Sequence, residues 1–152
     1  MIYQLCRNGH PTNYDSAKHP ENNKNFCPTC GEATLLGCPD CGAPIDDISG
    51  SSLSFRAANY CKNCGHSLPW TESALKAARE LAQAQRNLSE AERDDLTASI
   101  GDLVKDTPTA TLAARKTRAI LDKAGPAVAS MFRDILVDLV SETAKKILFP
   151  PF

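Results

Sequence analysis

Residues 27–42 read CPTCGEATLLGCPDCG, and this stretch holds two Cys-x2-Cys pairs that are each followed by a glycine. A Cys-x2-Cys turn lets two thiolates reach one Zn²⁺ at about 2.3 Å, and the glycine permits the tight backbone after it. A third pair of the same form lies downstream at 61–65, as CKNCG. The pairs at 38–42 and 61–65 together look like a zinc ribbon, so this part of the chain predicts metal binding.

All seven cysteines lie between positions 6 and 64, and the odd count becomes even once His10 is added. A disulfide framework fits poorly, because the count is odd and the start MIYQLCRNGHPTN lacks the features of an export signal. Eight ligands in four pairs are enough for two closed tetrahedral zinc sites. The predicted ligands are Cys6, His10, Cys27, Cys30, Cys38, Cys41, Cys61 and Cys64.

Two pairings of the ligands are open. Sequential pairing puts Cys6/His10/Cys27/Cys30 on one ion and Cys38/Cys41/Cys61/Cys64 on the other. Cross-braced pairing resembles a ubiquitin-ligase type finger, in which two or three residues separate the second and third pairs. Seven residues separate them here, which favours sequential pairing.

Two zinc ions per chain are expected, and both are expected to be structural, because a catalytic zinc keeps one position open. An iron–sulfur cluster and a catalytic dithiol are the alternatives, and His10 with four evenly paired knuckles favours zinc. His66, directly after Cys64-Gly65, could replace a cysteine, but a residue there more often faces solvent or supports a ligand. His19 reads as a loop residue, and residues 44–59 as a loop or hairpin within the second site.

The composition changes near Trp70, which predicts a double zinc-binding module over 1–70, a connecting helix over 71–88 and a three-helix unit over 89–152. The expected fold is thus a small metal-stapled module of short β hairpins and knuckles, followed by an all-α region of about four helices. Thr71 is the expected N-cap of the first helix, and Ser89 to Glu92 form a capping-box pattern for the second. The expected helices cover about 72–88, 90–105, 108–124 and 126–148.

Two apolar faces are expected on these helices. The last helix has a broad stripe at helical spacing that suits the core of the unit. The first has a narrow seam, and we expect it to be available for a protein partner or for self-association. The seam consists of Ala74, Ala77, Leu81, Ala84 and Leu88.

Composition and charge exclude several functions. The net charge of −1 argues against bulk binding to nucleic acid or to an anionic membrane. The apolar runs are too short to cross a bilayer, and we therefore expect a cytoplasmic protein. Residues 1–70 carry 5 Lys+Arg against 6 Asp+Glu, and seven thiolates on two Zn²⁺ lower the charge of this module to about −4. The basic residues of 115–123 are explained by a solvated helix face, and no catalytic constellation is present.

Five stretches resemble a bacterial family of unknown function, over nearly the whole chain. They are CRNGHPTN, FCPTCG, YCKNCGHSLPWTE, LVKDTP and SETAKKIL. The resemblance implies an N-terminal double zinc-binding region, with these eight ligands, and a short helical C-terminal region. It implies no activity.

The sequence therefore favours a non-enzymatic zinc-ribbon adaptor or assembly subunit that mediates protein–protein interaction or self-association. A zinc-ribbon nucleic-acid-binding regulator is the first alternative, which the charge disfavours. An effector or enzyme component of a larger bacterial complex is the second.

Overall fold

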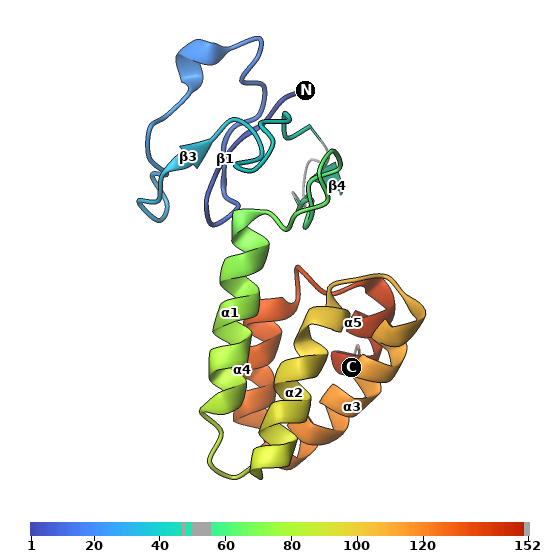
Figure 1. Ribbon diagram of the computed structural model, residues 1–152. Coiled ribbons are helices and arrows are strands. Elements are labelled where there is room, and N and C mark those ends of the chain that lie inside the picture. Colours follow the sequence, from blue (N-terminus) through green and yellow to red (C-terminus); the bar gives the residue numbers. More distant parts are fainter. Residues whose placement is uncertain (47, 50–55, 151–152) are drawn as a thin grey trace. The chain divides into compact units, whose positions relative to one another are not determined.

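The chain divides into two compact units, Met1–Ser73 and Ala74–Phe152, and each is described separately. A computed structural model describes residues 1–46, 48–49 and 56–150. The first unit holds short strands and the cysteines, and the second is helical (Figure 1). The predicted fold class, a metal-binding module followed by an all-α region, is confirmed.

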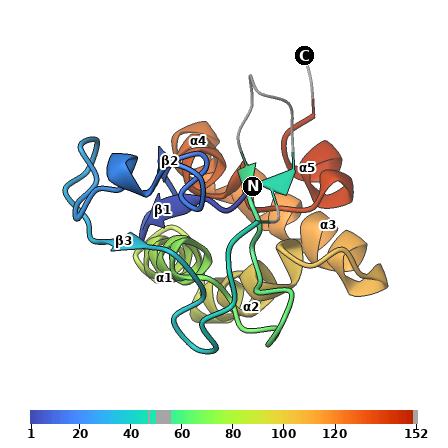
Figure 2. The same cartoon turned by 90° about the horizontal axis from the view of Figure 1, so that it is seen from above.

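The first unit contains two small antiparallel sheets. Strands β1 (Gln4–Cys6), β2 (Pro11–Asn13) and β3 (Thr34–Leu35) form the first, in the order β2-β1-β3 (Figure 2). Strands β4 (Ile48–Ser49) and β5 (Arg56–Ala57) form the second, so residues 44–59 contain the predicted hairpin. Positions 47 and 50–55 of that prediction lie outside the described residues.

A buried glutamine organises the long connection between β2 and β3, which includes the 3₁₀ helix η1 (Pro20–Asn22). Gln4 is 3% exposed; its Nε2 donates to the Lys24 carbonyl at 2.9 Å, and its Oε1 accepts from the Lys24 N–H at 2.9 Å. The Thr12 hydroxyl also donates to Oε1, at 2.9 Å. The N–H and carbonyl of Lys24 lie outside the strands, and the Gln4 side chain supplies a partner for both. Gln4 therefore fixes the segment that leads into Cys27.

Helix α1 (Pro69–Gln83) both begins and ends earlier than the predicted range of 72–88. Thr71 is not the N-cap: its hydroxyl donates to the Asn59 carbonyl at 2.8 Å, and the Leu68 carbonyl accepts from the Thr71 N–H at 3.0 Å. Pro69 takes the first helical position, which proline accommodates because its missing N–H would have no partner there. The helix start is therefore tied to the segment between β5 and Cys61.

The second unit follows the predicted helix boundaries in its middle part. Helix α2 (Glu90–Leu103) begins with the predicted capping box, in which the Glu92 N–H donates to the Ser89 hydroxyl and the Ser89 N–H donates to the Glu92 carboxylate, both at 3.1 Å. Helix α3 (Pro108–Ala124) contacts α2, α4 and α5, and its C-cap is Gly125, whose φ is 106°.

The single helix predicted over 126–148 is wrong, because the chain forms α4 (Pro126–Leu136) and α5 (Glu142–Leu148). Ser141 separates them: its hydroxyl accepts from the Ala144 N–H at 3.3 Å, and its own N–H donates to the Leu103 carbonyl at 3.0 Å. A serine side chain at this point caps a new helix, which competes with continuation of the old one.

The predicted seam is only partly correct. Leu88 is buried and Ala74 and Leu81 pack against the core, but Ala77 and Ala84 are exposed, and Leu75, Ala78 and Ala82 are buried in their place. These buried residues belong to the core cluster of the second unit, together with Leu96, Ile100, Leu103, Leu121, Phe132, Leu136 and Val140. The apolar face of α1 thus packs within the chain, so it is not left over for a partner.

Candidate metal centres

The three Cys-x2-Cys-Gly segments fold into the same turn. In each, the glycine N–H donates to the carbonyl of the first cysteine at 2.8 Å. The glycine φ is 78° at Gly31, 75° at Gly42 and 76° at Gly65, a backbone conformation that other residues adopt at a cost. The N–H of the first cysteine donates to the carbonyl of the residue after the glycine, and this bond closes each turn into a tight knuckle. The glycines that the sequence places after each pair therefore set the direction of both thiols.

The first knuckle carries a cysteine and a histidine, and its turn is one residue shorter. The Gly9 N–H donates to the Cys6 carbonyl at 2.9 Å, and the Cys6 N–H donates to the His10 carbonyl at 3.0 Å. The φ of Gly9 is 85°. This turn directs the Cys6 thiol and the Nδ1 atom of His10 to the same side.

The first cluster brings together Cys6, His10, Cys27 and Cys30. Nδ1 of His10 lies 3.5 Å from Sγ of Cys6 and 3.7 Å from Sγ of Cys27. The sulfur atoms of Cys6 and Cys30 are 3.7 Å apart. Zinc at about 2.3 Å from sulfur and about 2.0 Å from nitrogen requires S···S edges of about 3.8 Å and S···N edges of about 3.5 Å in a tetrahedron. The ligand atoms therefore fit a zinc ion.

The second cluster brings together Cys38, Cys41, Cys61 and Cys64. The sulfur atoms of Cys38 and Cys64 are 3.7 Å apart, and those of Cys41 and Cys61 are 3.6 Å apart. A disulfide needs about 2.05 Å, so these are free thiols with the spacing of four ligands around one ion. Both clusters follow the sequential pairing, and the cross-braced alternative is excluded.

Backbone N–H groups point at the sulfur atoms. The N–H of Asn8 lies 3.3 Å from Sγ of Cys6, and the N–H of Thr29 lies 3.4 Å from Sγ of Cys27. Burial raises the pKa of the Cys6 thiol above its ordinary value. At Cys61 the backbone N–H groups of Cys64 and Asn63 lower the pKa to about 6. Each cluster therefore presents partial positive charge to its thiolates before a metal ion adds its own.

Cys27 shows the same balance in the first cluster. Burial acts to raise its pKa, but hydrogen bonds from the N–H groups of Thr29 and Cys30 and from the side chains of His10 and Cys30 together lower the pKa to about 6. A thiol with this pKa is largely ionised near neutral pH, which is the form that binds metal.

Two asparagine side chains, which the sequence analysis missed, also reach the clusters. Nδ2 of Asn8 lies 3.4 Å from Sγ of Cys30, and Nδ2 of Asn63 lies 3.5 Å from Sγ of Cys41. The signal was present as a repeated tripeptide, because both asparagines follow a cysteine and a basic residue, in CRN at 6–8 and CKN at 61–63.

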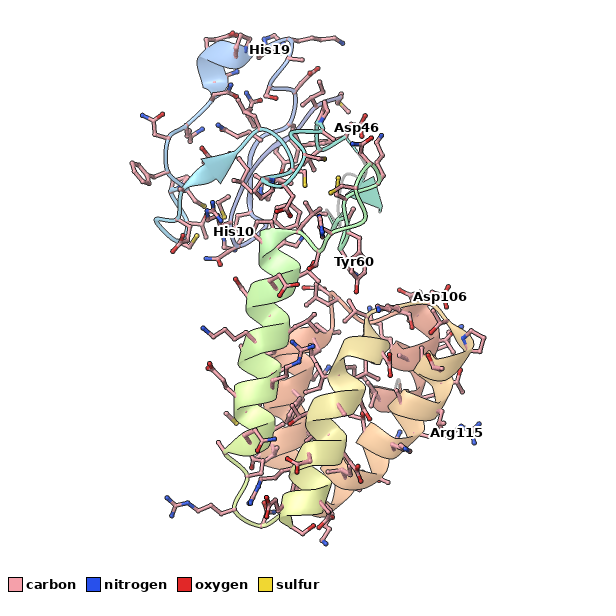
Figure 3. All side chains as sticks on the ribbon, in the orientation of Figure 1. His10, His19, Asp46, Tyr60, Asp106 and Arg115 are labelled. Atoms are coloured by element: carbon pink, nitrogen blue, oxygen red, sulfur yellow. The ribbon has the colours of Figure 1, made fainter. Side chains whose placement is uncertain are left out.

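The two remaining histidines lie outside both clusters of the described chain. His66 is exposed, with Nδ1 3.7 Å from the Asp40 carboxylate. His19 is exposed as well, with Nδ1 3.1 Å from the Glu21 carboxylate, and it lies at the opposite end of its unit from His10 (Figure 3). Since each cluster already has four ligand atoms, neither histidine is needed for coordination.

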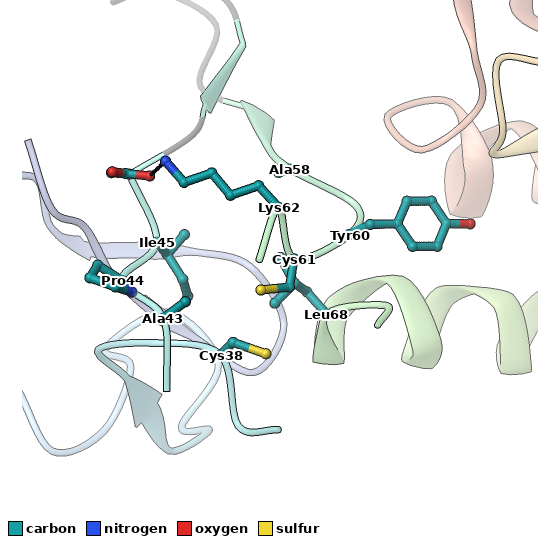
Figure 4. Close-up of a pocket in the computed structure, with 10 residues that line it drawn as sticks. Cys38, Ala43, Pro44, Ile45, Ala58, Tyr60, Cys61, Lys62 and Leu68 are labelled. Atoms are coloured by element: carbon teal, nitrogen blue, oxygen red, sulfur yellow. Dashed lines mark ion pairs between the residues drawn. The ribbon is translucent and has the colours of Figure 1, made fainter. Parts of the chain in front are cut away.

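The second cluster is braced by the loop that precedes β4. Lys62, between two ligands, forms an ion pair with Asp46 at 2.5 Å (Figure 4). Ile45 and Leu68 pack beside Cys38 and Cys61. The cavity between these residues has a volume of about 20 Å³, about enough for a single water, so it is no substrate site.

Comparison with known proteins adds a family to this geometry. A family model described as an uncharacterized protein conserved in bacteria (DUF2321) matches residues 1–148. No curated protein and no solved structure matches the chain. In the part of the chain that the structure describes, no helix combines the length and apolar character required to cross a bilayer.

Proposed function

We propose that this chain, which belongs to the bacterial DUF2321 family, binds two zinc ions and presents the folded metal unit as a non-enzymatic adaptor for a protein partner. The observation that carries the proposal is the pair of tetrahedral ligand sets, each with four strong ligands within 4.8 Å of one another. Zinc that is held by four protein ligands has no position left for water or substrate, so its role is structural.

Zinc also accounts for how so small a unit can fold. Its strands are two or three residues long, and its apolar cluster is limited to a few side chains around Leu5 and Trp70. A core of that size stabilises a fold poorly, whereas structural zinc contributes about 10–16 kcal/mol in small zinc modules. Thiolate ligands of this kind need a reducing compartment, and we place the protein in the cytoplasm for that reason.

Exposed apolar side chains on the metal unit support a protein partner. Phe26, which forms a bridge with Ala33, is 65% exposed, and Leu36, which directly follows strand β3, is 52% exposed. Large apolar side chains that remain in water are a feature of surfaces that bind other proteins. We therefore propose that the partner binds the metal unit rather than the seam on α1.

The charge of the metal unit favours a protein over a nucleic acid. An open groove of about 490 Å³ on this unit is lined by Glu32, Asp40 and Glu72, with Arg7 as its one cation. Carboxylates in this position repel phosphate, and bound thiolates add further negative charge. A regulator that binds nucleic acid would need a net positive charge on this surface.

The metal part of the proposal is tested by native mass spectrometry of the full chain together with elemental analysis. The expected result is two zinc ions per chain, and one zinc ion after Cys38→Ser. Iron, or fewer than two metal ions in the wild type, would contradict it.

The adaptor part is tested by photo-crosslinking in the host bacterium, with a photoreactive phenylalanine at position 26. The matched control carries the same residue at Leu112, which is 59% exposed on α3. A discrete protein adduct at position 26, with none at 112, supports the proposal, provided that both variants retain two zinc ions. Salt-sensitive retention of the wild type on DNA or RNA, without a protein adduct, supports the regulator instead.

A further inference from the structure

The two clusters share an arrangement in which one asparagine contacts two knuckles. The Asn8 N–H donates to Sγ of Cys6 in its own knuckle, and its side-chain Nδ2 donates to Sγ of Cys30 in the facing knuckle. Asn63 does the same in the second cluster, with its N–H directed at Cys61 and its Nδ2 at Cys41. The repetition occurs although the two knuckles differ in length and in ligand type.

The thiols that receive the asparagine side chains are the exposed ones. Cys30 and Cys41 are exposed, whereas Cys27 and Cys38 are each 3% exposed. A zinc-bound thiolate at the surface can be reached by water, electrophiles and competing chelators, and only local donors restrain it. An N–H···S hydrogen bond withdraws charge from the sulfur and fixes the side chain in its ligating rotamer.

We propose that Asn8 and Asn63 are positioning residues that hold the exposed ligands Cys30 and Cys41 on their metal ions and lower the reactivity of these two thiolates. This inference rests on the proposed zinc binding. Loss of the donor should leave more charge on the sulfur and allow the cysteine to dissociate more often. Each asparagine should act on its own cluster only.

The alternative is that the asparagines merely fill space, and a pair of substitutions separates the two roles. Asn→Asp keeps the shape but replaces the donor with a carboxylate, whereas Asn→Ala removes both the donor and the volume. A packing role predicts that Asp resembles the wild type and that Ala is worse. A donor role predicts that Ala is worse than the wild type and that Asp is worst, because the carboxylate also repels the thiolate.

The experiment measures alkylation of the zinc-loaded full chain by N-ethylmaleimide at pH 7.5, resolved by residue with mass spectrometry. Zinc transfer to a chromophoric chelator is followed in parallel. The variants are Asn8→Ala, Asn8→Asp and the same changes at Asn63, with Asn22→Asp as the charge control on the exposed end of η1. Outer hydrogen-bond partners of metal ligands typically contribute 10–100-fold to metal affinity.

We expect Asn8→Asp to accelerate alkylation of Cys30 and zinc release from the first cluster by about tenfold, with Cys41 unchanged. Asn63→Asp should give the reverse pattern, and Asn22→Asp should change neither rate. Rates within twofold of the wild type, or the order expected for a packing role, would overturn this inference. A zinc content of two would still uphold the proposed zinc binding. A wild type that contains no zinc would overturn both.

Discussion

The indole ring of Trp70 lies against Gly9, so closely that a Cβ atom on Gly9 would be 3.1 Å from Cγ of the ring and 3.2 Å from the Trp70 Cβ. Trp70 is 7% exposed, and its Nε1 donates to the Ala58 carbonyl at 2.9 Å. One side chain therefore contacts the turn that presents Cys6 and His10 and also the segment between β5 and Cys61. The two metal sites share this support.

Gly9→Ala should lower the free energy of unfolding of the zinc-loaded chain by at least about 2 kcal/mol. The new methyl group meets the indole, and a residue other than glycine is strained at a φ of 85°. Unfolding in guanidinium chloride, monitored by the fluorescence of the single tryptophan, measures the change.

Gly31→Ala is the matched control for this prediction. Gly31 has a φ of 78° and occupies the corresponding turn, but a Cβ there meets nothing within 4 Å. Only the backbone strain remains, so we expect a loss of about 1–2 kcal/mol. Equal losses in the two variants would mean that the indole moves aside and does not define the first turn.

The metal clusters could be predicted from the sequence because ligand chemistry restricts both residue type and spacing. Two thiolates three positions apart, followed by glycine, have few uses other than a metal knuckle, and the structure places all eight ligands as the sequential pairing requires. The capping box at Ser89 and Glu92 could also be predicted from the sequence, because it needs only local hydrogen bonds.

The buried face of α1 could not be predicted, because the helix carries alanines on both sides. The spacings of three and four residues hold for Ala74, Ala77 and Leu81 as well as for Leu75, Ala78 and Ala82. Only tertiary packing decides between the two faces. The contacts of Asn8 and Asn63 were hidden for a similar reason, since they bridge segments more than 20 residues apart.

Removal of zinc with a chelator should unfold the metal unit and leave most of the helical signal. Every cysteine precedes position 65, and the second unit has its own apolar core around Phe132 and Ile100. Loss of structural zinc removes about 10–16 kcal/mol from a small module. Trp70 fluorescence should therefore shift while circular dichroism at 222 nm keeps most of its amplitude.

Cys38→Ser provides the corresponding genetic test, since it disrupts one ligand set without a chelator. Complete loss of the helical signal in this variant would show that the two units fold as one cooperative block.

The helical unit should lose stability in acid through Glu92. Lys123 at 2.7 Å, together with the N–H and hydroxyl of Ser89, lowers the pKa of this carboxyl group to about 2, against an ordinary value of 4.5. Because the folded pKa is the lower one, the stabilisation is complete above about pH 4.5 and disappears as the pH falls through about 2. Glu92→Gln should therefore reduce stability at pH 7, with a difference from the wild type that vanishes towards pH 2.

Glu90→Gln is the control for this pH dependence, because Glu90 lies in the same helical turn and experiences the same helix dipole. Urea unfolding followed at 222 nm between pH 7 and pH 2 measures both variants, and any loss of metal at low pH affects both equally. A Glu90→Gln difference that matches Glu92→Gln across this range would assign the effect to the helix dipole rather than to Lys123.

Two adjacent alanines on α1 allow the orientation of this helix to be tested with one substitution. Ala78 is fully buried, so Ala78→Gln overpacks the core and buries an amide, and we expect the helical unit to lose about 3 kcal/mol or more. Ala77 is exposed, so Ala77→Gln should change stability by no more than about 0.5 kcal/mol. Thermal unfolding followed at 222 nm measures both variants, and light scattering of each reports self-association. If the order were reversed, or if Ala77→Gln lowered the molecular mass of a wild-type oligomer, then the face that contains Ala77 would be a contact between copies of the chain.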